Sequence, residues 1–78
     1  MGEIPLVIVD GERAVLHLVE AALPVRELGT RLAVYLAPGR VEDAQFVWLS
    51  SDGPRVLDPG RTVGEQVPAE AEIEIRAG

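Results

Sequence analysis

The sequence predicts an α+β domain in which one mixed five-stranded sheet packs on one helix, with the elements in the order ββαβββ. Three observations lead to this prediction. An aliphatic run followed by Asp10-Gly11 has the pattern of an N-terminal hairpin. A stripe of apolar residues at helical spacing follows it. The chain then closes on strict alternation of apolar and acidic residues, which is typical of a strand with one buried face.

The first third of the chain is expected to be the hairpin. Residues 4–9 are mostly β-branched or aliphatic and form the first strand, with Pro5 near its start. Residues 14–19 form the second strand after the Asp-Gly turn. Alternation along this second strand separates two faces, Leu16 and Leu18 on one and Val15, His17 and Val19 on the other.

The single long helix is expected to begin at Leu23-Pro24, because proline is favoured at the first helical position. Ala37-Pro38-Gly39 is expected to end it. Between these limits, four apolar residues recur at i, i+3, i+7 and i+11 and form the stripe that faces the sheet: Val25, Leu28, Leu32 and Leu36.

The second half is expected to supply three strands, at residues 46–49, 55–57 and 71–75, with a turn at residues 51–54. The stretch between the last two begins with the turn Asp58-Pro59-Gly60. Thr62 and Glu65 then have the spacing of a capping box, which starts a short helical turn. Val67 follows as a single apolar residue, and Pro68 ends that turn.

Length and composition limit the function classes. The chain has 78 residues, so we expect one domain over residues 1-78. Its net charge of −6 disfavours nucleic acids and anionic membranes as partners and permits a basic protein partner. The sequence has no cysteine, no apolar run of membrane-spanning length and no secretory leader, so we expect a cytoplasmic protein that does not insert into a membrane.

Catalytic and metal-binding chemistry is not expected. His17 is the only histidine and sits in an alternating strand, where a structural or solvent-exposed role is the ordinary one. Glu70, Glu72 and Glu74 form an acidic row on the last strand, but neither histidine nor cysteine occurs at ligand spacing to them. We therefore expect a protein that is not an enzyme and that uses neither a metal nor a cofactor.

The element order, with Arg61-Thr62-Val63, Val67 and the closing strand in these places, resembles the ubiquitin-like β-grasp family over nearly the whole chain. In detail it looks most like the small YukD/EsaB-type ubiquitin-like proteins of bacterial type VII secretion. That resemblance implies a non-enzymatic accessory protein that acts through contacts with a protein partner, as a monomer or weak oligomer. The features behind it are Leu23-Pro24-Val25 with Leu28, Trp48, and LDPGRT with EQ and Val67.

Two alternatives stay open. The segments VLHLV, RLAVYLAPGRV and PAEAEIEI resemble the small ubiquitin-like subunit of bacterial multicomponent monooxygenases, which implies a structural subunit of a hydroxylase. The other alternative is a modifier or sulfur carrier that an adenylating enzyme activates at Gly78. Such relatives end in a flexible Gly-Gly tail, and alignment on Val67 and Ile73 ends this chain a few residues short of that position. This comparison favours the binding module.

The third strand offers the expected binding surface. Alternation sends Phe46 and Trp48 to one side and Val47 and Leu49 to the other, and one helix covers only one face of a sheet. The family pattern implies that the aromatic pair faces outward, where tryptophan is a frequent contact residue. The alternative is that both aromatics lie in the core and that Val47 and Leu49 are exposed. Four further residues are expected to extend or edge the surface: His17, Arg55, Glu74 and Arg76.

Overall fold

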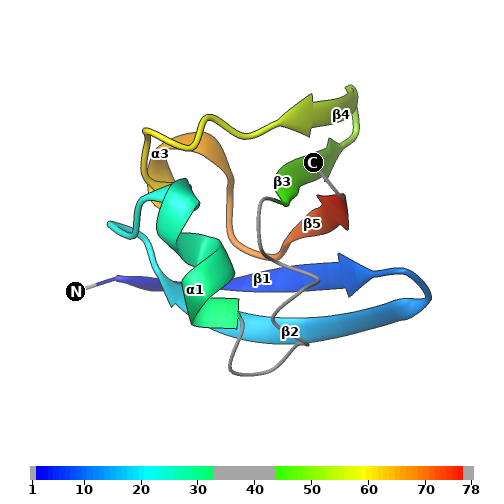
Figure 1. Cartoon of the computed structure of the whole chain (residues 1–78), viewed down its shortest axis with the longest axis horizontal. Helices are drawn as coiled ribbons and strands as arrows, with labels where there is room; N and C mark the ends of the chain where they lie inside the picture. The colour runs from blue at the N-terminus through cyan, green and yellow to red at the C-terminus, as the bar shows by residue number, and fades with distance from the viewer. Residues whose placement is uncertain (1, 33–43, 77–78) are drawn as a thin grey trace.

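A computed structural model of the chain describes residues 2–32 and 44–76 (Figure 1). The expected positions of Leu36, of the helix end at residues 37–39 and of Gly78 lie outside these residues. The described elements are β1 (Glu3–Asp10), β2 (Arg13–Glu20), the 3₁₀ turn η1 (Val25–Glu27), α1 (Leu28–Leu32), β3 (Gln45–Ser50), β4 (Gly53–Val56), α3 (Val63–Gln66) and β5 (Ala71–Arg76).

The five strands form one mixed sheet in the order β2-β1-β5-β3-β4, which confirms the predicted fold class. β1 and β5 are parallel neighbours, and the other adjacent pairs are antiparallel. The β1–β2 hairpin closes at the pair Asp10–Arg13, and Gly11 at the first loop position has a φ of 64°. Glycine adopts this left-handed conformation without steric cost, which is why Asp10-Gly11 predicts the turn correctly.

The fourth strand differs in detail from the expectation. Only Ser51 and Asp52 form the loop, since Ser50 pairs with Gly53, and the strand ends at Val56 instead of Leu57. The Leu57 side chain is buried in the core, and its backbone N–H donates to the Phe46 carbonyl at 2.9 Å.

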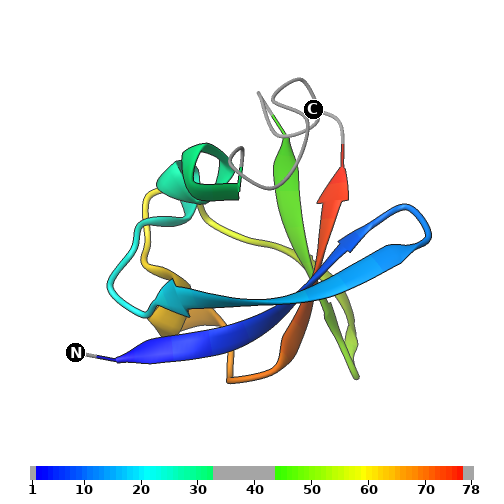
Figure 2. The same cartoon turned by 90° about the horizontal axis from the view of Figure 1, so that it is seen from below.

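The described helices and the segment of residues 57–66 lie on one side of the twisted sheet (Figure 2). Of the predicted stripe, Val25, Leu28 and Leu32 are buried between this layer and the sheet. Pro24 caps η1 instead of beginning it, because residues 23–25 pair with residues 61–63 through the bonds Val25 N–H to Arg61 O and Val63 N–H to Leu23 O. The core consists of the buried side chains of Leu6, Ile8, Val19, Leu23, Val25, Leu28, Leu32, Phe46, Leu57, Val63, Val67, Ala71, Ile73 and Ile75.

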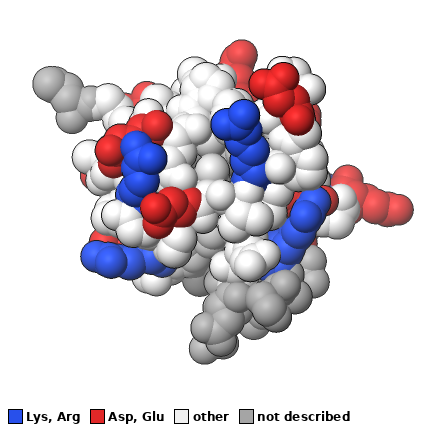
Figure 3. Space-filling view, turned by 90° about the horizontal axis from the view of Figure 1, so that it is seen from above, with Lys and Arg blue, Asp and Glu red and all other residues white. Residues whose placement is uncertain are grey.

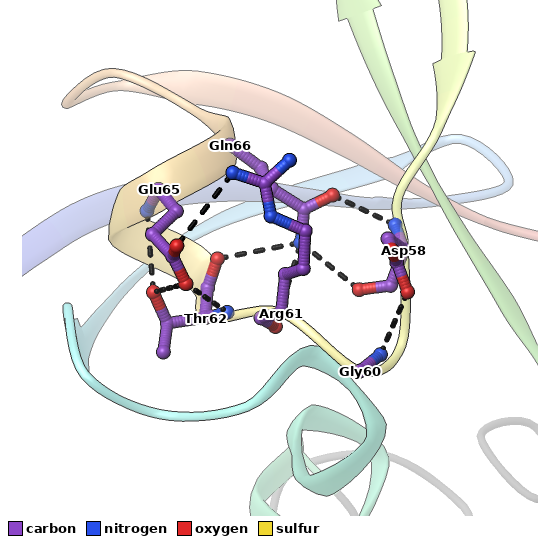
Figure 4. Close-up of polar contacts among 6 residues, drawn as sticks. All are labelled: Asp58, Gly60, Arg61, Thr62, Glu65 and Gln66. Atoms are coloured by element: carbon purple, nitrogen blue, oxygen red, sulfur yellow. Dashed lines mark hydrogen bonds and ion pairs between the residues drawn. The ribbon is translucent and has the colours of Figure 1, made fainter.

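The predicted capping box at Thr62 and Glu65 is confirmed (Figure 4). The Glu65 N–H donates to Thr62 Oγ1 at 3.3 Å, and the Thr62 N–H donates to Glu65 Oε1 at 3.0 Å. The hydrogen bond from the Thr62 backbone, together with the one from its hydroxyl, lowers the pKa of Glu65 from its ordinary value, because both favour the charged carboxylate.

Gln66 closes the turn before α3 by a two-point contact with Asp58 (Figure 4). The Asp58 N–H donates to Gln66 Oε1 at 2.7 Å, and Gln66 Nε2 donates to the Asp58 carbonyl at 3.0 Å. The Asp58 carboxylate in turn accepts from the Gly60 N–H at 2.9 Å. These bonds tie Asp58 both to Gly60 in the turn and to Gln66 at the end of α3.

Candidate interaction surface

The side chains of β3 point to the opposite faces of the sheet from those that were expected. Phe46 is 6% exposed and belongs to the core, and Trp48 is partly buried and packs against it. Phe46 pairs with Ile75, and Trp48 pairs with Ile73. Directly opposed residues of neighbouring strands point to the same face, so the aromatic pair follows the two buried isoleucines to the helix side. The prediction that Phe46 and Trp48 face outward is therefore wrong. The alternative holds for Phe46 alone, since Trp48 is only partly buried and Val47 is fully buried.

The six residues expected to form one surface are divided between the two faces. Arg55 pairs with Trp48, and His17 pairs with the buried Leu6, so both point to the helix side. Glu74 pairs with Val47, which places it on the other face, and Arg76 shares that face because it lies two residues further along β5. The six residues therefore do not form one surface patch. Whether each residue takes part in binding is a separate question from its position.

On the helix side these residues also lie far apart. Trp48 and Arg55 line an open hollow of about 290 Å³ beside Glu65 and Gln66. His17 lines another hollow, of about 600 Å³, which runs along β2. Since β2 and β4 are the two outer strands of the sheet, the two hollows are at opposite edges.

The face of the sheet away from the described helices, here called the open face, carries most of the exposed aliphatic surface. Leu16 and Leu18 on β2 are 60% and 63% exposed, and Val56 on β4 is 61% exposed. Sequence reasoning assigned the two leucines to one face of the hairpin, but took the other face for the surface. The signal that identifies the open face is the register of β3 against β5.

Residues on the open face form rows across the strands. One row is given completely by the strand pairs and reads Ala14, Val9, Glu74, Val47 and Val56 from β2 to β4. The next row begins with Leu16, Val7 and Glu72. Each row therefore has an acidic residue on the central strand β5 with aliphatic residues beside it.

The two glutamates of β5 differ in their contacts. Arg76 Nε donates to Glu74 Oε1, so an arginine on the same face neutralises this carboxylate. Glu72 is exposed, and no hydrogen bond or ion pair joins its carboxylate to another of the residues that the structure describes. Among the described residues of β5, Glu72 is therefore the outward carboxylate that has no cation beside it.

Residues 2–32 and 44–76 contain no group of three or more His, Asp or Glu side chains placed to hold a metal ion. Among the same residues, no helix has the length and apolarity needed to cross a bilayer. The face viewed in Figure 3 carries several basic side chains that are separated by uncharged and acidic surface instead of forming a stripe.

Solved structures resemble the chain closely in backbone. The C-terminal ubiquitin-like domain of mouse tubulin-specific chaperone E superposes with a TM-score of 0.77 at 13% identity, over 97% of this chain and 87% of that one. A ubiquitin-like domain of an Arabidopsis thaliana protein gives 0.76 at 14% identity, over 99% and 79% of the two chains. The fold is the ubiquitin-like β-grasp.

Ubiquitin itself is among the β-grasp structures that match. The ubiquitin of Caldiarchaeum subterraneum has a TM-score of 0.69 at 17% identity, over 99% of this chain and 95% of that one. By sequence, neither a family model nor a curated protein matches the chain. The likeness in backbone therefore establishes the β-grasp fold alone. The proposed function rests on the surface of this chain.

Proposed function

We propose that the protein is a non-enzymatic interaction module that binds a protein partner through the open face of its β-grasp sheet. The observation that supports this proposal is the exposure of Leu16, Leu18 and Val56 on the face away from the described helices. Leu16 and Leu18 lie together on β2, whereas Val56 lies at the opposite edge of the sheet on β4. Neighbouring exposed leucines on one strand are typical of contact sites.

These exposed side chains contribute little to the stability of the fold and would contribute much to a complex. Burying the exposed parts of Leu16, Leu18 and Val56 would stabilise a complex by roughly 1–2 kcal/mol each. On β1, the partly buried Val7 lies beside Leu16 and the partly buried Val9 lies beside Ala14, so the aliphatic surface of β2 continues onto β1. A partner that covers β2 and β1 therefore gains most of this contribution without disturbing the core.

Affinity capture from extract of the native cells tests the proposal. The protein carrying both Leu16→Ser and Leu18→Ser should lose the partner that the unchanged protein retains. The matched control combines Val15→Ser on β2 with Arg55→Ser on β4. Both residues are exposed and point to the helix side of the sheet. Equal capture by the leucine double variant, or a loss with the control alone, would contradict the open face as the site.

A modifier or sulfur-carrier role is the second candidate, and the likeness to the ubiquitin of Caldiarchaeum subterraneum favours it. In that role an adenylating enzyme would activate the carboxylate of Gly78. Incubation with such an enzyme and ATP, followed by mass spectrometry of the intact protein, tests this role. An adenylate or thioester at Gly78 would support it, and an unmodified chain in the presence of an enzyme active on its own substrate would remove it.

For the setting, we propose the cytoplasm of a bacterium with type VII secretion, on the resemblance of Leu23-Pro24-Val25 and LDPGRT to YukD/EsaB-type proteins. The monooxygenase subunit is the alternative setting. Gene neighbourhood distinguishes the two, since a secretion cluster supports the first and a diiron hydroxylase cluster supports the second.

A further inference from the structure

The charge on the open face lies in the middle of the aliphatic surface instead of at its rim. Glu72 and Glu74 occupy successive outward positions of β5, which is the central strand of the sheet. Val7 and Val9 lie directly beside them on β1, and Val47 lies beside Glu74 on β3. A purely apolar partner would therefore bury the Glu72 carboxylate without compensation, which costs several kcal/mol per ion.

A basic side chain in the partner removes that cost. Glu74 already has Arg76 as a neighbour, so the group that needs a cation is Glu72. An arginine or lysine placed over Glu72 would form a charge-assisted hydrogen bond while its neighbours contact the partly buried Val7 and Val9 on β1. A second copy of this chain does not meet the requirement, since two open faces placed together would bring the central glutamates of both copies into one interface.

The dimensions of the face suit a helix. β1 and β3 flank β5 at two strand spacings from each other, which is about 10 Å. A helix with its side chains has a diameter of about 10–12 Å, so one lying on β5 reaches Val7 and Val9 on β1, whereas Val47 on β3 is fully buried and contributes no contact. Helix on sheet is also a standard way of covering a sheet face, and this sheet already packs a helical layer on its other side.

We propose that the open face binds an amphipathic helix whose apolar side carries arginine or lysine residues at its centre, with a basic residue over Glu72. This inference rests on the proposed function, because it names the partner chemistry of that same surface. The overall charge of −6 adds long-range attraction for such a helix and makes its association dependent on salt.

Two synthetic helical peptides test the inference by titration into the isotope-labelled protein, followed by NMR. Both carry leucines at i, i+1, i+7 and i+8, which surround position i+4 on one side of the helix, and this central position is arginine in the first peptide and glutamate in the second. The arginine peptide should shift the resonances of Val7, Leu16 and Glu72, and its affinity should fall as salt is raised. The glutamate peptide should bind at least about tenfold more weakly, since like charges oppose each other at the interface.

Charge-reversing variants show which carboxylate is responsible. Glu72→Lys should weaken the arginine peptide by about tenfold and improve binding of the glutamate peptide. The matched control is Glu27→Lys, which makes the same change of charge at an exposed residue of η1 on the helix side and should leave both affinities within about twofold. Circular dichroism of each variant confirms that the fold is retained.

The other outcomes overturn the inference in distinguishable ways. Equal binding of both peptides at the open face would remove the requirement for a basic partner and leave the proposed function standing. Failure of the arginine peptide to bind, or shifts centred on Trp48 and Arg55, would overturn the basic helix as occupant. The proposed function itself is judged separately, by the capture experiment with the Leu16→Ser and Leu18→Ser variant.

Discussion

Phe46 lies directly opposite Ile75 in the antiparallel β3–β5 ladder, and both side chains are buried beneath the helical layer. This single pairing decides which face of the sheet is available to a partner. Because Phe46 points inward, Val47 and the neighbouring aliphatic residues of β1 and β2 point to the open face. The surface argued for binding is therefore built on aliphatic residues and two glutamates instead of on the aromatic pair.

Removal of the Phe46 side chain should destabilise the fold. Phe46→Ala leaves a cavity in the core and is expected to lower the free energy of unfolding by about 3–5 kcal/mol. Leu18→Ala is the matched control, since its side chain is 63% exposed and its loss should cost well under about 1 kcal/mol. Urea denaturation followed by circular dichroism measures both, and similar stability of the two variants would contradict the assigned orientation of β3.

Trp48 should behave as a structural residue with no part in binding at the open face. It is only partly buried, so Trp48→Ala is expected to cost about 2–3 kcal/mol, less than Phe46→Ala. The affinity for a captured partner, measured below the unfolding transition, should stay the same. A stable Trp48→Ala protein that no longer binds the partner would instead support the aromatic surface.

Gly64 should not tolerate a side chain, because α3 approaches the end of β2 closely. A Cβ at this position would lie 2.8 Å from Ala21 Cβ and 3.0 Å from the Ala21 carbonyl oxygen, which accepts the Gly64 N–H at 2.8 Å. Gly64→Ala is expected to destabilise the protein by about 1–3 kcal/mol. At Gly60 the nearest atom to an added Cβ is Asp58 Oδ1 at 3.4 Å, so a Gly60→Ala control should be much milder in thermal denaturation.

The capping box should make part of the stability depend on pH. The lowered pKa of Glu65 means that the folded state binds this proton more weakly than the unfolded state does. The charged Glu65 carboxylate therefore stabilises the folded state fully above the ordinary pKa of 4.5. This stabilisation is lost as the pH falls through the lowered pKa that Glu65 has in the folded protein. Thr62→Ala should reduce stability by about 1 kcal/mol at neutral pH.

The same variant provides the pH test. Unfolding by urea is compared between the unchanged protein and Thr62→Ala at neutral pH and at successively lower values below 4.5. The difference in stability between them should shrink as Glu65 becomes protonated. A constant difference over this range would show that the carboxylate takes no part in the cap.

The sequence predicts most of the fold because its local signals are strong and consistent. Gly11 in the hairpin loop, the Thr62–Glu65 spacing and the alternation of β5 each determine a local structure with little tertiary contribution. Element ends shift where tertiary contacts compete, as at Leu57, whose side chain enters the core while β4 stops at Val56.

The candidate surface was harder to predict, for a physical reason. All four residues from Phe46 to Leu49 are apolar, so alternation defines two faces without saying which is buried. The decision comes from the register against β5, a contact between residues nearly thirty positions apart in the chain. The Gln66–Asp58 contact escaped prediction for a similar reason, since it depends on the path of the intervening loop.

Site-specific photo-crosslinking with the captured partner tests the central claim most directly. A photoreactive residue is placed at position 18 on the open face in one protein, and at position 55 on the helix side in another. Both positions are exposed and lie on outer strands, so each probe is equally accessible. We predict a crosslink to the partner from position 18 and none from position 55. A crosslink from position 55 alone would contradict the assignment of the open face as the binding surface.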